Sequence, residues 1–448
     1  MALAYLLQLT LHSISRVSKL SKSKINSYIK ILSINSLKSI LLLSLIVPWV
    51  ALNGTESKVY LGIDVLEENR FSVLKGKRVG ILTHPAGVNR RGISTIDVLC
   101  RSRYVTVVAL YGPEHGIYGN EKANQPIDNR IDKKTNLPVY SLYGRYRKPQ
   151  PEMLANIDTL VIDLQDIGVR SYTYVSCMLY AMEACFENNI EVVILDRPNP
   201  LGGKKIDGPL LDREWKSYVG AFPVPYLHGL TIGELAILAK SMPNWMNIES
   251  KTRKQGRLKV IPMRGWKRSM LWPETGLKWI ATSPYIPSFS SVLGYAMTGL
   301  GAQEGGFSHG IGTPYPFRLL THKNLSSDAL IKRLQALDIS GLDYKIIRTR
   351  NTKGDPVSGV YVGINNWRRL KPTELSFYMM LMVIDLERPN PFQTTTRSDL
   401  FNKHVGSTQW WSELIQNKGK PRIQYFMKRW KQEQESYKKK IENYLIYN

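Results

Sequence analysis

The sequence of 448 residues has little cysteine, with three residues, and few acidic side chains, with 36 Asp and Glu against 61 Lys and Arg. Three cysteines cannot build a disulfide scaffold, so we expect Cys100, Cys177 and Cys185 to be free thiols on buried helix faces. With 33 Gly, 24 Pro and 43% hydrophobic residues, the composition excludes a collagen-like, low-complexity or disordered chain. The length predicts two folded domains.

Motifs for nucleotides, nucleic acids and metals are missing as well. The chain has no Walker sequence, and no Gly-x-Gly-x-x-Gly follows the first predicted strand. The net charge of +25 is spread along the chain, without a zinc finger, a helix-turn-helix signature or an RNP motif. The histidines are scattered. We therefore expect no nucleic-acid partner, no cofactor and no metal, and a diffuse basic surface that attracts anionic material.

Long hydrophobic runs are absent except near the N-terminus. Residues 40–52 form an apolar run of 13 residues, and residues 1–53 hold six basic side chains and no acidic one. A membrane-spanning helix needs about 20 apolar residues, whereas a shorter run suits the core of a signal peptide. We expect residues 1–53 to be a signal peptide or an N-terminal membrane anchor. The protein would then be exported, to the periplasm or the cell exterior, with possible membrane attachment.

The segment from residue 59 to 250 alternates strand-like and helix-like patterns. Strands are predicted over 78–84, 105–112, 159–166 and 191–198, and helices over 93–100 and 171–187. Continuous apolar strands that are separated by helices predict an α/β fold with a parallel sheet covered on both faces.

A second region covers residues 258–448. Gly, Pro and Ser are dense from 273 to 316, a helix is predicted over 327–337 and a strand over 359–364. The chain closes with a predicted amphipathic helix, which indicates packing on a core. Its apolar face comprises Ile423, Phe426, Met427, Trp430, Tyr437, Ile441 and Tyr444.

Polar residues follow each predicted strand of the first region. In open α/β sheets, ligands bind beyond the carboxyl ends of the strands, so these residues are site candidates. In chain order they are His84, then Glu114 and His115, then Asp163, Asp166 and Arg170, and finally Asp196, Arg197 and Asn199.

Glu114 is the sharpest catalytic candidate. Pro113 before it and Gly116 after it predict a fixed turn at a strand end. Such a turn can hold a carboxyl group in a partly dehydrated position, which suits a general acid for glycosidic-bond cleavage. The alternative is that Glu114 caps a helix or pairs with an arginine. Asp166, which lies nearer the strand exit than Asp163, is the second candidate catalytic carboxylate.

The other polar groups are candidate substrate contacts with structural alternatives. Arg170 could bind a substrate carboxylate through two nitrogens or lock a loop. Asp163 could merely organise backbone amides, and Asp196 with Arg197 could form an internal ion pair. The expected substrate-binding residues are His84, His115, Asp163, Arg170, Asp196, Arg197, Asn199, His228 and Glu304.

The Gly-rich segment 299–313 places Glu304, Ser308 and His309 where they could reach a cleft between the domains. Its glycines would permit close approach of the backbone to a ligand, or the segment is an ordinary connection. Upstream aromatic residues could stack on a sugar or pack in the core. These are Trp266, Trp272, Trp279 and Tyr285.

Ordered motifs give the chain a family resemblance over about residues 59–448. They include Gly-Pro-Glu-His-Gly at 112–116, Leu-Pro-Val-Tyr-Ser-Leu-Tyr-Gly at 137–144 and Asp-Leu-Gln-Asp-Ile-Gly-Val-Arg at 163–170. Further matches lie at 62–65, 74–80, 195–200, 228–235 and 263–268. The chain resembles the exo-β-N-acetylmuramidase family, also known as DUF1343 or YbbC-like proteins.

The resemblance implies a Rossmann-like domain at residues 59–250, followed by a smaller α+β domain at 258–448 that completes the cleft. It also implies exo-cleavage of non-reducing terminal N-acetylmuramic acid from peptidoglycan fragments. The catalytic glutamate of the family motif corresponds to Glu114. No second catalytic group is implied.

Three segments depart from the family pattern. Thr-His-Pro stands at 83–85 in place of Thr-Asn-Gln, and the segment 301–314 lacks an arginine and a carboxylate that relatives carry. The strand at 359–363 lacks a histidine. These differences bear on the substrate range.

We therefore expect an exported glycoside hydrolase that acts on muramyl saccharides, with Glu114 as general acid/base. Asp166 or Glu304 would assist, and Arg170 with neighbouring basic groups would hold the lactyl carboxylate. A non-catalytic muropeptide or cell-wall binding protein of the same fold is the alternative. An intracellular Rossmann-type nucleotide or sugar-phosphate enzyme is the third.

Overall fold

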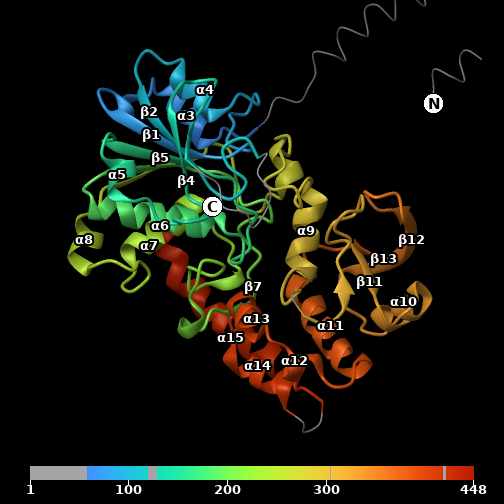
Figure 1. Cartoon of the computed structure of the whole chain (residues 1–448). Coiled ribbons are helices and arrows are strands. Elements are labelled where there is room, and N and C mark those ends of the chain that lie inside the picture. Colours follow the sequence, from blue (N-terminus) through green and yellow to red (C-terminus); the bar gives the residue numbers. More distant parts are fainter. Residues whose placement is uncertain (1–57, 120–128, 303, 417–419) are drawn as a thin grey trace, which may run out of the picture. The chain divides into compact units, whose positions relative to one another are not determined.

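The computed structural model describes residues 58–119, 129–302, 304–416 and 420–448. The expected signal peptide or anchor, residues 1–53, lies outside the described residues. Within them, no helix combines the length and the apolar character that are needed to cross a membrane. The described ranges all belong to one unit of the chain, residues 57–448, and they form three sheets (Figure 1).

The first sheet has seven strands in the order β3-β4-β2-β1-β5-β6-β9. All neighbouring pairs are parallel except β3 with β4. The strands are β1 (Arg78–Thr83), β2 (Thr106–Gly112), β3 (Arg130–Ile131), β4 (Pro138–Ser141), β5 (Thr159–Asp163), β6 (Glu191–Leu195) and β9 (Leu258–Ile261).

Helices cover both faces of this sheet because its central strands are apolar on both sides; every residue of β5 is buried. The helices of this region are α3 (Gly62–Glu68), α4 (Thr95–Cys100), α5 (Pro151–Leu154), α6 (Tyr174–Glu187), α7 (Ile232–Ser241) and α8 (Ser250–Gln255).

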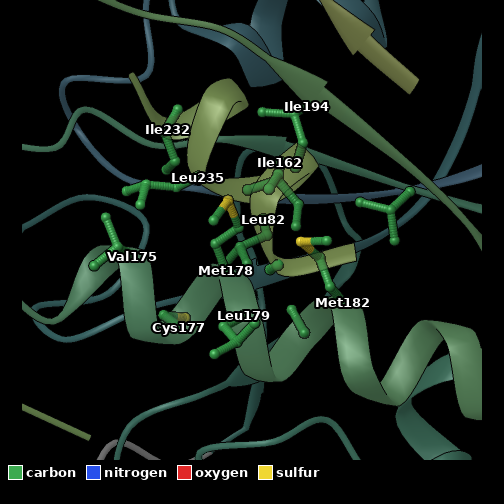
Figure 2. Packing of buried hydrophobic residues seen from close by; sticks show 14 of the residues in the cluster. Leu82, Ile162, Val175, Cys177, Met178, Leu179, Met182, Ile194, Ile232 and Leu235 are labelled. Atoms are coloured by element: carbon green, nitrogen blue, oxygen red, sulfur yellow. The ribbon is translucent and has the colours of Figure 1, made fainter. Parts of the chain in front are cut away.

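Strand periodicity divides the core of the first sheet into two clusters. Leu82, Ile162 and Ile194 are register neighbours across β1, β5 and β6, and they pack against α6 and α7. Figure 2 shows Met178 and Met182 of α6 in this cluster. The alternate residues of the strands pack in the second cluster, with α3 and α4. The predicted α/β fold is confirmed.

Two antiparallel sheets complete the fold. The larger has the order β10-β11-β13-β12, and the smaller pairs β7 with β8. Their strands are β7 (Asp207–Leu210), β8 (Pro225–Leu227), β10 (Phe307–Ser308), β11 (Leu319–His322), β12 (Leu342–Arg350) and β13 (Pro356–Ile364). The later helices are α9 (Phe289–Thr298), α10 (Ser327–Gln335), α11 (Pro372–Leu386), α12 (Pro391–Thr394), α13 (Ser398–Val405), α14 (Thr408–Ile415) and α15 (Ile423–Ile441). Short 3-10 turns lie at Ser72–Leu74, Arg213–Trp215, Trp272–Thr275 and Glu442–Tyr444.

The two expected regions share residues. β9, which we expected to open the second region, pairs with β6 as an edge strand of the first sheet. The chain end also returns to that sheet: the Tyr447 hydroxyl donates to Asp196 at 2.6 Å and accepts from the Met263 N–H at 2.8 Å. Tyr447 is buried in the cluster that contains α3 and α4.

The cysteines follow the prediction at two of three positions. Cys177 and Cys185 are buried on α6, whereas Cys100 is exposed. The expectation for Cys100 was wrong because it is the last residue of the six-residue helix α4, where the core-facing positions are Ile96, Val98 and Leu99.

Candidate active site

Glu114 stands in a tight turn directly after β2. The Gly116 N–H donates to the Pro113 carbonyl oxygen at 2.9 Å, and His115 has a φ of 73°. A positive φ is unfavourable for a residue with a Cβ atom, so surrounding contacts must hold this turn. Gly112 makes room for it, because a Cβ atom there would lie 3.1 Å from the Gly116 Cα. The turn fixes Glu114, half-buried, at the carboxyl end of β2.

Hydroxyl groups surround Glu114. Thr173 donates to its Oε2 at 3.3 Å, and Tyr143 is hydrogen-bonded to its side chain. The Tyr174 hydroxyl donates to the Thr282 carbonyl oxygen at 2.6 Å and lies 3.4 Å from the Glu114 carbonyl oxygen. Burial and the nearby Glu114 carboxylate raise the pKa of Tyr143 to about 12. Its phenol therefore keeps its proton at neutral pH and is a hydrogen-bond donor to the carboxylate.

The N-terminus of α6 lies beside this carboxylate. Thr173 immediately precedes the helix, which runs for 14 residues. Backbone N–H groups at a helix start carry partial positive charge, and they stabilise a nearby anion by about 0.3–1 kcal/mol. The helix therefore supports a negative charge on Glu114, in addition to the two hydroxyl donors.

An exposed cation adjoins these residues. The Arg147 Cζ atom lies 4.3 Å from the ring centre of Tyr218 and 5.6 Å from that of Tyr143. Arg147 is exposed, and in the described part of the chain its guanidinium forms no ion pair. Because Tyr143 also contacts Glu114, the structure places an available guanidinium near the candidate catalytic carboxylate.

Helix α9 also reaches this neighbourhood. The Tyr295 hydroxyl lies 3.1 Å from the Ser171 Oγ, which donates to the Tyr226 hydroxyl at 3.3 Å. Burial and the charge of Glu114 raise the pKa of Tyr295. The site thus includes a residue beyond the first sheet, although a different one from those predicted.

His84 is fully buried beneath the site. Its ring packs edge-on against Tyr174, with centroids 4.7 Å apart, and its Nε2 accepts from the Gln165 N–H at 2.9 Å. Burial and the charge of Arg197 lower its pKa well below the usual value, so the ring is neutral. Its Nδ1 then carries the proton and has no hydrogen-bond partner among the described residues. His84 and Glu114 thus both contact Tyr174.

Asp166 and His228 form a buried pair. The Asp166 Oδ2 accepts from the Gly168 N–H at 2.7 Å and lies 3.3 Å from the His228 Nε2. The His228 Nδ1 accepts from the Leu230 N–H at 3.1 Å, which places the ring proton on Nε2, toward Asp166. Asp166 Oδ1 has no hydrogen-bond partner in the described part of the chain. This oxygen is buried, and a buried carboxylate oxygen without a protein partner calls for a bound water or ligand hydroxyl.

Tyr172 links Asp166 to the tyrosines at Glu114. Burial, with a smaller effect of the Asp166 charge, raises the pKa of Tyr172. The Tyr172 ring packs against Tyr174 with centroids 4.9 Å apart. The structure therefore brings both predicted catalytic carboxylates into one aromatic neighbourhood.

Asp163 and Arg197 pair with each other. The Arg197 Nε donates to Asp163 at 2.5 Å and a terminal nitrogen donates at 2.8 Å, while Thr95 donates to the same carboxylate. Arg197 also donates to the Val88 carbonyl oxygen at 2.6 Å. Asp163 is fully buried. The ion pair that we considered for Asp196 is therefore made by Asp163, and it braces the ends of the central strands.

Arg170 locks loops. Its guanidinium donates to four carbonyl oxygens, those of Pro209, Val224, His404 and Val405, at 2.8–3.1 Å. The side chain is 1% exposed. Since these donors are occupied and out of reach of solvent, the structure favours the structural alternative for Arg170 over contact with a substrate carboxylate.

Asp196 and Asn199 likewise bond within the protein. Asp196 accepts from the Arg197 and Gly233 N–H groups and from the Thr231 and Tyr447 hydroxyls. Its burial raises its pKa to about 7. Asn199 donates to one backbone carbonyl and accepts from one backbone N–H. These contacts hold the loop after β6 in place.

The Gly-rich segment packs against α11. A Cβ atom on Gly301 would meet Met380 at 2.2 Å, and one on Gly305 would meet Val383 at 2.5 Å. These glycines therefore let the backbone of the Gly-rich segment lie close to α11. Glu304 accepts from the Thr395 hydroxyl at 2.8 Å.

The upstream aromatic residues mostly pack in the interior. Trp266 packs edge-on against Tyr447, and Trp272 against Trp279. Trp266 and Trp272 are buried, whereas Tyr285 is 46% exposed.

Sequence reasoning missed Tyr143, Thr173 and Arg147. Tyr143 is the penultimate residue of the motif at 137–144, and Thr173 lies in the first turn of the helix predicted over 171–187, but no local pattern shows that they meet Glu114. In the described residues, no group of three or more His, Cys, Asp and Glu side chains is placed to hold a metal ion.

Comparison with known proteins places this chain in a family. The chain matches the family models for the N-terminal and C-terminal parts of exo-β-N-acetylmuramidase NamZ, at residues 79–290 and 293–447. It is 36% identical over 394 residues to the peptidoglycan β-N-acetylmuramidase NamZ of Bacillus subtilis, covering 87% of this chain and 92% of that protein.

Two solved structures of DUF1343 family proteins from Bacteroides fragilis are also similar. Their TM-scores are 0.78 and 0.66, and their identities are 37% and 27%; each match covers 87% of this chain and 99% of the other. The predicted family is confirmed: this chain belongs to the exo-β-N-acetylmuramidase NamZ family.

Proposed function

We propose that this protein is an exo-acting glycoside hydrolase that releases the non-reducing terminal N-acetylmuramic acid from peptidoglycan fragments, with Glu114 as its general acid/base. Family membership supports the reaction class. The surroundings of Glu114 support its assignment as the general acid/base. Its carboxyl is half-buried, held by a strained turn and hydrogen-bonded by Thr173 and Tyr143.

This arrangement supports the carboxylate that remains on Glu114 after it transfers its proton. Protonated Glu114 would donate its proton to the glycosidic oxygen as the bond to the leaving sugar breaks. The carboxylate left behind would be stabilised by the Tyr143 phenol and by the start of α6. It could then accept a proton from the water that completes hydrolysis.

Asp166 is the proposed second carboxylate. One oxygen is held by Gly168 and lies close to the His228 Nε2, while the other has no partner among the described residues. A fixed carboxylate with one unpartnered oxygen can orient a water or stabilise positive charge on the sugar ring.

The lactyl carboxylate of the substrate calls for a cation near the site. Arg170 is buried and bonded to four carbonyls, so we assign this role to Arg147. Its exposed guanidinium is stacked on Tyr218 close to Tyr143. A planar guanidinium held on an aromatic ring can still present two N–H donors to a carboxylate.

Glu114→Gln tests the catalytic assignment. We expect kcat on a chromogenic β-MurNAc glycoside and on MurNAc-GlcNAc to fall by about 10²- to 10⁴-fold, because glutamine cannot transfer the proton. Glu249→Gln, exposed at the start of α8, is the matched control and should retain most activity.

Two outcomes would contradict the proposal. Undiminished release by Glu114→Gln would remove Glu114 from the mechanism. Binding of muropeptides without any release by the wild type would favour a non-catalytic binding protein.

Export is part of the proposal. The basic segment and apolar run within residues 1–53 support it, as does a substrate that comes from the cell wall. Cell fractionation should recover the protein in the periplasm or outside the cell, and N-terminal sequencing should distinguish a cleaved signal from a retained anchor. Recovery in the cytoplasm alone would contradict it.

A further inference from the structure

A second cavity lies apart from Glu114. Its volume is about 680 Å³, and it is lined by residues 201–208, which lead into β7, residues 268–269, residues 367–374, which lead into α11, and one side of α15. None of the residues assigned to catalysis above lines it. Its size falls within the range of about 300–1,000 Å³ that is common for small-molecule sites.

The lining is strongly basic. Eight lysine and arginine side chains face three carboxylates. Some cations are already bonded: Arg268 pairs with Glu234 at 2.7 Å, and Lys438 pairs with Glu435 at 2.7 Å. Others are not.

Five cations of the cavity are available. They are exposed, and their side chains make no hydrogen bond or ion pair within the described residues: Lys204, Arg368, Arg369, Lys371 and Lys431. Like charges that line one cavity repel one another, so an anion bound among them would gain from several cations at once.

Hydrogen bonds from Lys205 hold the backbone of the segment that contains Arg368 and Arg369. The Lys205 Nζ donates to the carbonyl oxygens of Trp367, Arg368 and Leu370 at 2.7–3.2 Å. Three hydrogen bonds from one ammonium fix the course of this segment, so its exposed guanidinium groups start from a defined backbone.

The far end of the same segment is held by Asp207. Its Oδ2 accepts from the backbone N–H and the hydroxyl of Thr373, both at 2.9 Å, where α11 begins. The segment 367–374 is therefore tied to residues 201–208 at both of its ends.

The cavity also offers one accessible aromatic ring. The Trp367 ring is half-buried and lies 5.3 Å from the Lys205 Nζ, whereas Phe377 and Trp430, which also line the cavity, are only 1% and 4% exposed. Aromatic faces accept the apolar C–H face of a sugar, and arginines accept its carboxylates through paired hydrogen bonds.

We propose that this cavity is a second binding site, separate from Glu114, for a carboxylate-bearing saccharide. The combination of available cations and the accessible Trp367 ring points to that chemistry. The site goes beyond the proposed function, since it needs no catalysis at Glu114. If glycan strands are the substrate, it would hold a strand while its end is processed, and two weak contacts on one chain act together.

The test uses Glu114→Gln as the parent, so that the probe is not consumed. Isothermal titration with a peptide-free MurNAc-GlcNAc oligosaccharide should show two binding events per chain. Arg368→Ala with Arg369→Ala should abolish one event or weaken it at least tenfold, and Lys204→Ala should weaken it independently. A neutral chitin oligosaccharide of the same length should not bind at this site.

Controls separate this proposal from failure of the proposed function. In the active background, Arg368→Ala with Arg369→Ala should leave kcat/KM on the small chromogenic glycoside within twofold of wild type. Lys332→Ala with Arg333→Ala removes the same charge from exposed positions of α10 that lie outside the cavity. Equal loss of binding in this control, unchanged binding in the cavity variant, or equal binding of the neutral oligosaccharide would each overturn the proposal.

Discussion

At the scale of single residues, Arg170 and Arg147 carry the same guanidinium group in opposite surroundings. Arg170 is buried, and burial lowers its pKa to about 10, which still leaves it charged at neutral pH. Its charge is balanced by four carbonyl dipoles. Arg147 is exposed and rests on tyrosine rings. One therefore serves stability and the other is free to meet a ligand.

Arg170→Gln should destabilise the fold by about 3 kcal/mol or more, because several buried carbonyl groups lose their donors together. Urea unfolding followed by tryptophan fluorescence measures this loss. Arg147→Ala is the matched control, and its unfolding midpoint should stay close to that of wild type. A stable Arg170→Gln protein would contradict the structural role.

Arg147→Ala should instead raise KM for a β-MurNAc glycoside by about 10-fold or more, since a charge-assisted hydrogen bond contributes about 1.5–3 kcal/mol. The same variant should bind a GlcNAc glycoside, which lacks the lactyl group, as wild type does. Arg147→Lys should restore only part of the affinity, because an ammonium cannot form the paired contact. An equal effect on both glycosides would exclude recognition of the lactyl group.

At the scale of elements, the long C-terminal helix joins separate parts of the core. The predicted apolar face of α15 is confirmed at Ile423, Phe426, Trp430, Tyr437 and Ile441, which are all buried. The first three pack with α9, α11 and α13, and the last two with the first sheet and α6. A single amphipathic stripe thus serves two hydrophobic clusters.

Phe426→Ala should cost about 3–5 kcal/mol of unfolding free energy, because it leaves a cavity between Trp410 and Trp430. Lys428→Ala, exposed on the same helix, should change stability by less than about 0.5 kcal/mol. Chemical denaturation of both variants gives the comparison. Similar losses would mean that helix propensity, and not core packing, governs the contribution of α15.

At the scale of the whole molecule, buried histidines make stability depend on pH. Burial lowers the pKa of His309 to about 4 and that of His84 well below its usual value. The unfolded chain therefore binds more protons between about pH 4 and 6.5, so stability is full above 6.5 and is lost as the pH falls. Asp196, whose pKa is raised to about 7, acts in the opposite direction over pH 4–7.

His309→Gln isolates one of these contributions. Lowering the pH from 7.5 to 5 should destabilise wild type more than the variant by about 2 kcal/mol, since each pKa unit corresponds to about 1.4 kcal/mol. Urea unfolding at the two pH values measures the difference. The same loss in both proteins would show that His309 does not titrate on unfolding.

Local sequence was sufficient to predict the central strands and helices. β1, β2, β5, β6, α6 and α15 were predicted within a few residues, because apolar periodicity reports directly on which face is buried. The turn at Glu114 was equally local, since Pro113 and the glycines on either side restrict the backbone there. The rule that ligands meet the carboxyl ends of parallel strands brought Asp166 and His84 into the same neighbourhood.

The sequence by itself therefore determined the α/β fold, the family and the leading catalytic candidate. Only the tertiary structure decided which charged residues are available. Arg170 is occupied by carbonyls from residues 404 and 405, and Asp196 by Tyr447 at the chain end, while Arg147 remains exposed. The reason is physical: a side chain's type is local, but its burial and its hydrogen-bond partners come from segments up to 251 residues away.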